Sequence, residues 1–187
     1  FQQINKSDLS KGKTTNYRDD SVYIDPRNEK LGAKIISKIK NIHLTIKKLD
    51  LNIVDKKKYY TESFNLGIPQ INLNKLKDKI FGIENNLDEL NGIDFKKGCY
   101  IGQENTSRIK LRKKLRRRIL PIQKISGDVS ENEIINYKNI EIGKVIIDKP
   151  YSFALVKVVD PDLKEVAGAE LVCGNSKIKI IKPKWID

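Results

Sequence analysis

The 187-residue sequence contains no methionine, a single histidine, only two cysteines and no long apolar run. Because it starts at Phe1 without an initiator methionine, we expect a fragment, a processed form, or a chain from which residues are missing. No segment approaches the ~20 consecutive apolar residues that cross a bilayer, and the first residues lack the apolar core of a signal peptide. We therefore expect a soluble, non-secreted protein with no membrane partner.

The scarcity of cysteine and histidine limits the metal and redox chemistry of the chain. Cys99 and Cys173 are far apart and neither has a Cys-x-x-Cys neighbour, which argues against a disulfide framework and a self-contained zinc site. We expect a reducing compartment and no stable metal on this chain alone. His43 stands in an alternating apolar stretch without a second histidine or a carboxylate pair, so it is interpreted as a structural residue of a strand.

Positive charge is in excess, because the chain has 37 lysines and arginines and only 24 acidic residues, which gives a net charge of +13. Such a charge attracts anionic partners, including nucleic acid, acidic proteins and polyanionic cofactors. The chain is also rich in Lys, Ile and Asn, which a genome biased toward A and T enriches in any protein. Most of the lysines are therefore interpreted as compositional rather than as a nucleic-acid surface.

The first part of the chain is predicted to mix strands and helices. A strand over 17–24 and further sheet within 31–46 flank a turn over 25–28. A helix over 52–66 fits a cap at Asp50 or Asn52 and a stop at Gly67. A short helical turn, a loop and a second helix are then expected over 85–90, 92–98 and 101–109.

The last part is predicted to be rich in short strands, at 119–125, 140–147, 153–159, 170–173 and 177–181. Turn residues separate these runs, and this spacing is typical of a small antiparallel β-barrel. The predicted fold class is therefore α+β. We place a domain boundary in the basic segment near residue 112, which gives domains at 1–112 and 113–187.

The segment 96–104 carries the clearest chemical signal. Cys99 lies between Gly98 and Gly102, two lysines precede it, and a predicted helix follows. Positive charge and a helix amino end both lower the pKa of a thiol toward the reactive thiolate, which ligates soft metals or attacks carbon. A buried cysteine that acts as a small apolar filler is the alternative, and the residues alone leave both open.

The run from Leu87 to Glu104, followed by Arg108, resembles the signature of the YgfZ family. That family is related to the folate-dependent T-protein of glycine cleavage, GcvT, which lacks the cysteine motif. The segments 25–32 and 60–69 match the family in the same order, so the resemblance covers about residues 17 to 120. It implies that 1–112 is the remainder of a GcvT/YgfZ-like folate-binding domain whose amino-terminal part is absent here, and that a small β-barrel domain follows.

The chain departs from the family at two points. Family members extend beyond the position of Phe1, and many have Arg-Gly where this chain has Arg112-Lys113. The resemblance places the protein in the cytoplasm if it is bacterial and in the mitochondrial matrix if it is eukaryotic.

The resemblance implies a protein that binds tetrahydrofolate, or a derivative, and supports the assembly or repair of iron–sulfur enzymes, including those that modify tRNA. A pterin edge suits a carboxylate, and the anionic glutamate tail suits an arginine. The candidates are Glu104, Glu84 and Asp94 for the pterin, Arg108 and Arg27 for the tail, and Tyr100 and Gln103 as further contacts. Glu104 and Arg108 are four residues apart, so on a helix they could instead pair with each other.

Cys99 is the predicted reactive thiol of this site. It would act as a transient iron ligand shared with a client or assembly protein, or as a trap for a one-carbon unit carried by folate. Because one cysteine cannot supply the four ligands of a cluster, any cluster must be shared with another molecule.

Two other functions remain open on the sequence. The first is a folate-dependent aminomethyl- or methyltransferase, for which no second catalytic group beside Cys99 is evident. The second is an RNA-binding module built on the basic run Arg108, Lys110, Arg112, Lys113, Lys114, Arg116, Arg117 and Arg118. The predicted barrel has few aromatic residues available to stack bases, which argues against the RNA-binding module.

Overall fold

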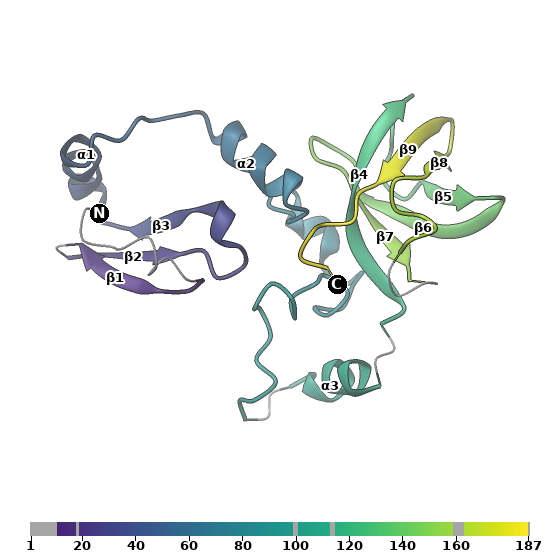
Figure 1. Ribbon diagram of the computed structural model, residues 1–187, viewed down its shortest axis with the longest axis horizontal. Coiled ribbons are helices and arrows are strands. Elements are labelled where there is room, and N and C mark those ends of the chain that lie inside the picture. Colours follow the sequence, from purple (N-terminus) through teal and green to yellow (C-terminus); the bar gives the residue numbers. More distant parts are fainter. Residues whose placement is uncertain (1–10, 18, 99–100, 113–114, 159–162, 187) are drawn as a thin grey trace. The chain divides into compact units, whose positions relative to one another are not determined.

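The computed structural model describes residues 11–17, 19–98, 101–112, 115–158 and 163–186 (Figure 1). The chain forms two compact units, Phe1–Tyr59 and Tyr60–Asp187. It is a mixed α/β protein with a closed antiparallel β-barrel, as the fold class predicted. The domain boundary expected near residue 112 remains a prediction.

The first unit contains a three-stranded antiparallel sheet in the order β1-β2-β3. Its strands are β1 (Thr14–Tyr17), β2 (Asp20–Ile24) and β3 (Ala33–Ile36). Tyr17 pairs directly with Asp20, so the chain reverses direction between them. The strand predicted over 17–24 is therefore present as β2 but starts later than predicted, because a hairpin turn separates Tyr17 from it.

The predicted turn at 25–28 is confirmed. The Asp25 side chain accepts a hydrogen bond from the backbone N–H of Arg27 at 3.0 Å. Asn28 caps the short 3-10 helix η2 (Glu29–Leu31) by accepting from the N–H of Lys30 at 3.0 Å. Asp and Asn therefore terminate β2 through local side-chain to backbone bonds.

The sheet predicted within 31–46 is wrong after β3, because residues 39–48 form the helix α1 (Ile39–Lys48). The apolar residues of this stretch fit both a strand period and a helix period. In the helix Ile42 and Ile46 are partly covered, whereas Leu44 between them is 57% exposed. An alternating strand would have placed all three on one face. His43 is accordingly an exposed helix residue rather than part of a strand.

The helix predicted over 52–66 is present as α2 (Lys56–Asn65), but its cap differs from the prediction. Asp55, rather than Asp50 or Asn52, accepts the hydrogen bond from the N–H of Lys57 at 2.7 Å. Gly67 follows the helix at φ +73, which confirms the predicted left-handed stop.

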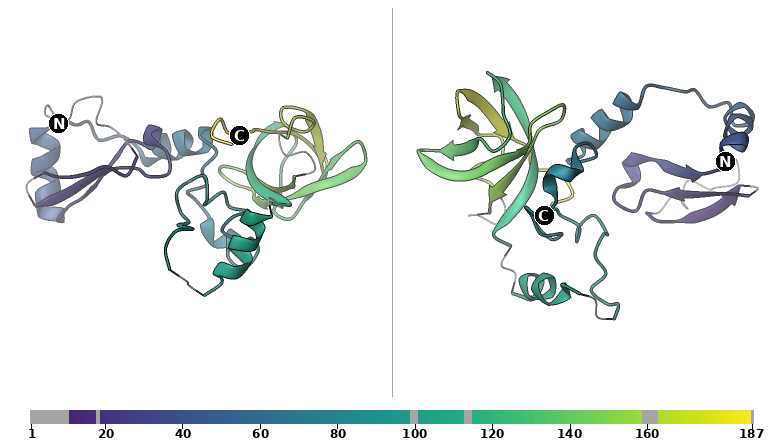
Figure 2. Two further views of the ribbon diagram at one scale, coloured as in Figure 1. Left: turned by 60° about the horizontal axis from the view of Figure 1, so that its bottom comes forward. Right: turned by 180° about the vertical axis from the view of Figure 1, so that it is seen from behind.

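The second unit is dominated by a closed barrel in the strand order β4-β7-β6-β5-β8-β9 (Figure 2). Its strands are β4 (Arg117–Ser126), β5 (Ile134–Tyr137), β6 (Ile140–Ile147), β7 (Phe153–Lys157), β8 (Glu170–Cys173) and β9 (Ser176–Ile180). The predicted barrel is therefore confirmed. The strand β5 was missed, because its short run Ile-Ile-Asn-Tyr does not alternate between apolar and polar residues.

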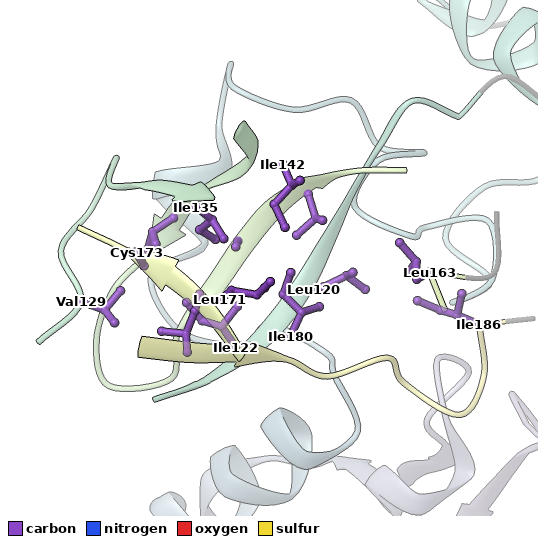
Figure 3. Packing of buried hydrophobic residues seen from close by; sticks show 14 residues of the cluster. Leu120, Ile122, Val129, Ile135, Ile142, Leu163, Leu171, Cys173, Ile180 and Ile186 are labelled. Carbon is purple, nitrogen blue, oxygen red and sulfur yellow. The ribbon is translucent and has the colours of Figure 1, made fainter. Parts of the chain in front are cut away.

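Inward-facing aliphatic residues from all the strands fill the barrel (Figure 3). Leu120, Ile135 and Ile178 are completely buried, and Cys173 lies among them with no exposed surface. Burial of several such side chains, each contributing about 1.5–3 kcal/mol, makes the barrel the main stabilising core of the unit.

Between α2 and the barrel the chain forms the 3-10 helix η3 (Leu73–Leu76), a series of turns over 82–91 and the helix α3 (Gln103–Leu111). The loop predicted over 92–98 has no helix or strand, and the helix predicted over 101–109 corresponds to α3. In the described part of the chain no helix has the length and apolar character needed to cross a membrane.

Candidate functional site

A cavity of about 660 Å³ lies in the second unit, beside the start of β4. The residues that line it come from the turns that begin near residue 81, from α3 and the segment after it, and from β4 and β7. They are Phe81, Glu84, Arg108, Ile109, Arg112, Leu115, Arg116, Arg117 and Lys157. Five of these side chains are cationic and one is a carboxylate, so the cavity is strongly basic.

Glu84, the only carboxylate among the lining residues, is already engaged. Its Oε1 accepts from Nε of Arg117 at 2.9 Å, and its Oε2 accepts from the backbone N–H of Phe81 at 2.9 Å. The Glu84 side chain is only 7% exposed. Both carboxylate oxygens therefore have partners, and Glu84 positions the Arg117 guanidinium at the cavity.

The next arginine anchors the same turns to the barrel. Arg118 Nη1 donates to the Asn86 side chain at 2.6 Å and pairs with Glu89 at 2.7 Å. Asn86 is fully buried and donates in turn to the backbone carbonyl of Ile119 at 2.8 Å. This polar network holds the turns over 82–91 against β4, so one wall of the cavity is fixed by hydrogen bonds.

Like charges meet where β4 pairs with β7. Arg117 and Lys157 are directly opposite each other in this ladder, an arrangement that is destabilising without compensation. Glu84 compensates Arg117, and Glu141 compensates Lys157 through an ion pair of 2.9 Å. Nothing in the sequence indicated Lys157, because only strand register brings it to the cavity.

Glu104 and Arg108 pair with each other on α3, at 2.5 Å between Arg108 Nη2 and Glu104 Oε1. This is the alternative that the four-residue spacing allowed. The Glu104 side chain is 81% exposed, and Glu104 is not among the cavity-lining residues. Arg108 lines the cavity together with Glu84, so the structure brings together two of the predicted site residues.

The basic run is partly neutralised by acidic neighbours. Arg108, Lys110, Arg117 and Arg118 each have a carboxylate partner, respectively Glu104, Asp88, Glu84 and Glu89. Lys113 and Lys114 lie outside the described residues. Within the described part, Arg112 and Arg116 have no acidic partner, so few charges of the run remain available to an RNA backbone.

The remaining predicted site residues are dispersed. Asp94 is exposed and accepts from the backbone N–H of Lys96 at 2.8 Å, and Gln103 is the first residue of α3. Cys99 and Tyr100 lie outside the described residues. No side chain of α3 is buried, and Ile101 just before it is fully exposed. Gly98, which precedes Cys99, is also exposed.

Arg27 belongs to the first compact unit and is held by Asp25. Its Nε and Nη2 donate to the two carboxylate oxygens of Asp25 at 3.0 and 2.8 Å. Burial acts to raise the pKa of Asp25, but the hydrogen bonds and charge of Arg27 outweigh it and lower this pKa. The same carboxylate raises the pKa of Arg27.

The second cysteine is a core residue. Cys173 is fully buried in the barrel, where burial and the nearby negative charge of Glu133 raise its pKa to about 11. Its thiol is therefore protonated at neutral pH and acts as a small apolar filler. Among the described residues, His, Cys, Asp and Glu form no group of three or more that could hold a metal ion.

Comparison with known proteins shows that this chain is similar to iron–sulfur cluster assembly factors. No family model matches the chain. The chain is 29% identical over 161 residues to the mitochondrial iron-sulfur cluster assembly factor IBA57 homolog of Neurospora crassa, covering 86% of this chain and 34% of that protein.

Two further relatives have the same name. The IBA57 homolog of Dictyostelium discoideum is 34% identical over 118 residues, which are 62% of this chain and 29% of the relative. That of Pyricularia oryzae is 34% identical over 97 residues, which are 52% of this chain and 24% of the relative. The chain thus spans about a third or less of the length of the curated relatives it matches.

Proposed function

We propose that this chain is part of a mitochondrial iron–sulfur cluster assembly factor. The observation that carries the proposal is the similarity to the Neurospora crassa IBA57 homolog, which extends over 86% of the chain. A match of this extent necessarily includes the Cys99 segment and α3. The segment on which the proposed chemistry depends therefore lies within the aligned region.

In this proposal Cys99 supplies one thiolate ligand to iron, and a partner or client protein supplies the others. A cluster needs four ligands, so one cysteine of a single chain can only share it with another protein. The exposure of Gly98 and Ile101, the nearest described residues before and after Cys99, supports this role, as do the exposed lysines 96 and 97. Positive charge close to a thiol favours the thiolate that binds iron.

The direct test replaces Cys99 by Ala in the full-length protein and measures the activity of an iron–sulfur client enzyme. We expect client activity to fall to the level seen without the protein. Cys173→Ala is the matched control, because it also removes one thiol but from the barrel core, and we expect it to retain client activity. Undiminished client activity with Cys99→Ala would remove the thiol from the mechanism.

We further propose tetrahydrofolate, or a derivative, as a ligand of the complete protein. The support is the resemblance of the 87–104 run to folate-binding relatives and the location of Arg108 at a cavity large enough for a small molecule. Equilibrium binding of tetrahydrofolate to the full-length protein, compared with Glu104→Ala, tests it. Equal affinity for both proteins would exclude Glu104 from the pterin site. Transfer of a one-carbon unit by the purified protein would instead favour the transferase alternative.

A further inference from the structure

The cavity beside β4 contains more positive charge than its own acidic residues neutralise. Glu84 compensates Arg117, while Arg108 and Lys157 have carboxylate partners that do not line the cavity. Arg112 and Arg116 also line it, and in the described part of the chain neither has an acidic partner. At least two guanidinium groups are thus left available to an anion.

The arginines are well suited to oxyanions. A guanidinium group presents planar donors that match phosphate and carboxylate oxygens in a bidentate manner. Arg117 cannot turn away from the cavity freely, because two of its nitrogens donate to Glu84 at 2.9 and 3.3 Å. The cationic wall is therefore partly ordered before any ligand arrives, which reduces the entropy lost on binding.

Size and apolar walls indicate a small molecule. The volume of about 660 Å³ falls in the range of small-molecule sites. Phe81, Ile109 and Leu115 supply apolar surface among the cations. Apolar walls of low dielectric strengthen the field of the charges that they surround.

We propose that this cavity binds a small polyanion whose phosphate or carboxylate groups are clustered. The site does not require the cluster chemistry of Cys99. It shares Arg108 and the cavity with the folate ligand proposed above, but Arg112 and Arg116 can bind an anion that carries no pterin, so titration with pterin-free probes tests it separately from folate binding. A small anion fits better than RNA, because four members of the basic run are occupied by carboxylates on the protein itself. An RNA strand needs several available cations spaced along its backbone.

The test uses calorimetric titration of the whole chain with two probes, tripolyphosphate and tetraglutamate, at constant ionic strength. The site variant is Arg112→Gln with Arg116→Gln, both of which are exposed. The matched control is Lys144→Gln with Lys184→Gln, two exposed lysines of the same unit that do not line the cavity. Both variants lower the net charge from +13 to +11, so only the location of the charge differs.

We expect saturable binding of at least one probe to the unmodified chain. The arginine variant should weaken the affinity for that probe by at least roughly tenfold, since the loss of even one hydrogen bond to a charged group lowers affinity by about this factor. The control should stay within about twofold, since distant exposed charges are screened. Binding of tripolyphosphate alone identifies phosphate as the ligand chemistry, and binding of tetraglutamate alone identifies carboxylate.

Three results would overturn the proposal. One is the absence of saturable binding by either probe. Another is equal weakening in both variants, which would show a response to net charge only. The third is binding of a short single-stranded RNA that neither probe displaces. Far-UV circular dichroism of both variants checks that the comparison is between folded proteins.

Discussion

Cys173 is expected to resist thiol reagents as long as the barrel is folded, and this prediction isolates the chemistry of Cys99. The thiolate is the nucleophile in alkylation, so the rate follows the ionised fraction and the access to sulfur. Burial, assisted by the charge of Glu133 at 3.6 Å from the sulfur, raises the pKa of Cys173 from 9.0 to about 11. Below pH 9 this shift alone lowers the thiolate fraction about 100-fold.

Access lowers the rate further, because Cys173 has no exposed surface. The reagent can reach the sulfur only when the barrel opens, so the observed rate should follow the population of the open state. The lowered thiolate fraction and the lack of access together predict that native Cys173 is alkylated more than about 100-fold more slowly than Cys173 of the unfolded chain.

The assay is iodoacetamide labelling at roughly pH 8, with and without urea, and mass spectrometry of the labelled peptides. The Cys99→Ala variant serves as the control, because its only remaining thiol is Cys173. Similar rates of Cys173 labelling with and without urea would refute both the burial and the raised pKa. With Cys173 protected, any rapid labelling of the native protein reports Cys99.

The same pKa shift has a consequence for stability. The folded state retains the proton of Cys173 while an unfolded thiol loses it above its ordinary pKa of 9.0. Between pH 9 and about 11 the unfolded state therefore binds fewer protons than the folded state, so the free energy of unfolding falls as the pH rises through this range.

Three further predictions concern the barrel and its ion pairs. Ile178→Ala removes a fully buried core side chain and should lower the free energy of unfolding by about 2–5 kcal/mol in urea titrations; a change in the range of surface substitutions would contradict the described core. Gly143→Ala would place a Cβ at 2.5 Å from the carbonyl oxygen of Leu155, so we expect a clearly lower melting temperature, and an unchanged one would be inconsistent with this close strand contact. Lys75 donates to Asp148 at 2.6 Å and holds the pKa of that carboxyl below 3.8, so the stability it contributes is present above pH 3.8 and lost as pH falls through the lowered pKa. Lys75→Ala should therefore destabilise the protein more at pH 7 than at acidic pH in urea titrations, and equal destabilisation at both would argue against this ion pair.

The sequence predicted the barrel well because its signals are local. Short runs such as 140–147 and 170–173 carry both the apolar residues of a core strand and turn residues on either side, and both were predicted with the observed bounds. The helix stop at Gly67 was also predictable, since a left-handed residue between a helix and Pro69 favours glycine.

Local signals failed where two periods fitted the same residues. The stretch 39–48 satisfies a strand pattern and a helix pattern alike, so the spacing of its apolar residues could not by itself select the helix. The hairpin between Tyr17 and Asp20 was missed for another reason, because the polar residues at this reversal include neither a glycine nor a proline that would mark a turn.

The sequence by itself determined the barrel, the turn at Asp25, the helix that follows the Cys99 motif, and the resemblance that the comparisons extend to iron–sulfur cluster assembly factors. Only the tertiary structure decided that Glu84 holds Arg117 from 33 residues away, that strand register adds Lys157, and that Arg112 and Arg116 are left without acidic partners at one cavity within the described chain. The physical reason is the sequence separation of the residues that interact. Turns, caps and strand periodicity depend on neighbours in sequence, whereas ion pairs and cavities depend on which distant segments the closed barrel brings together.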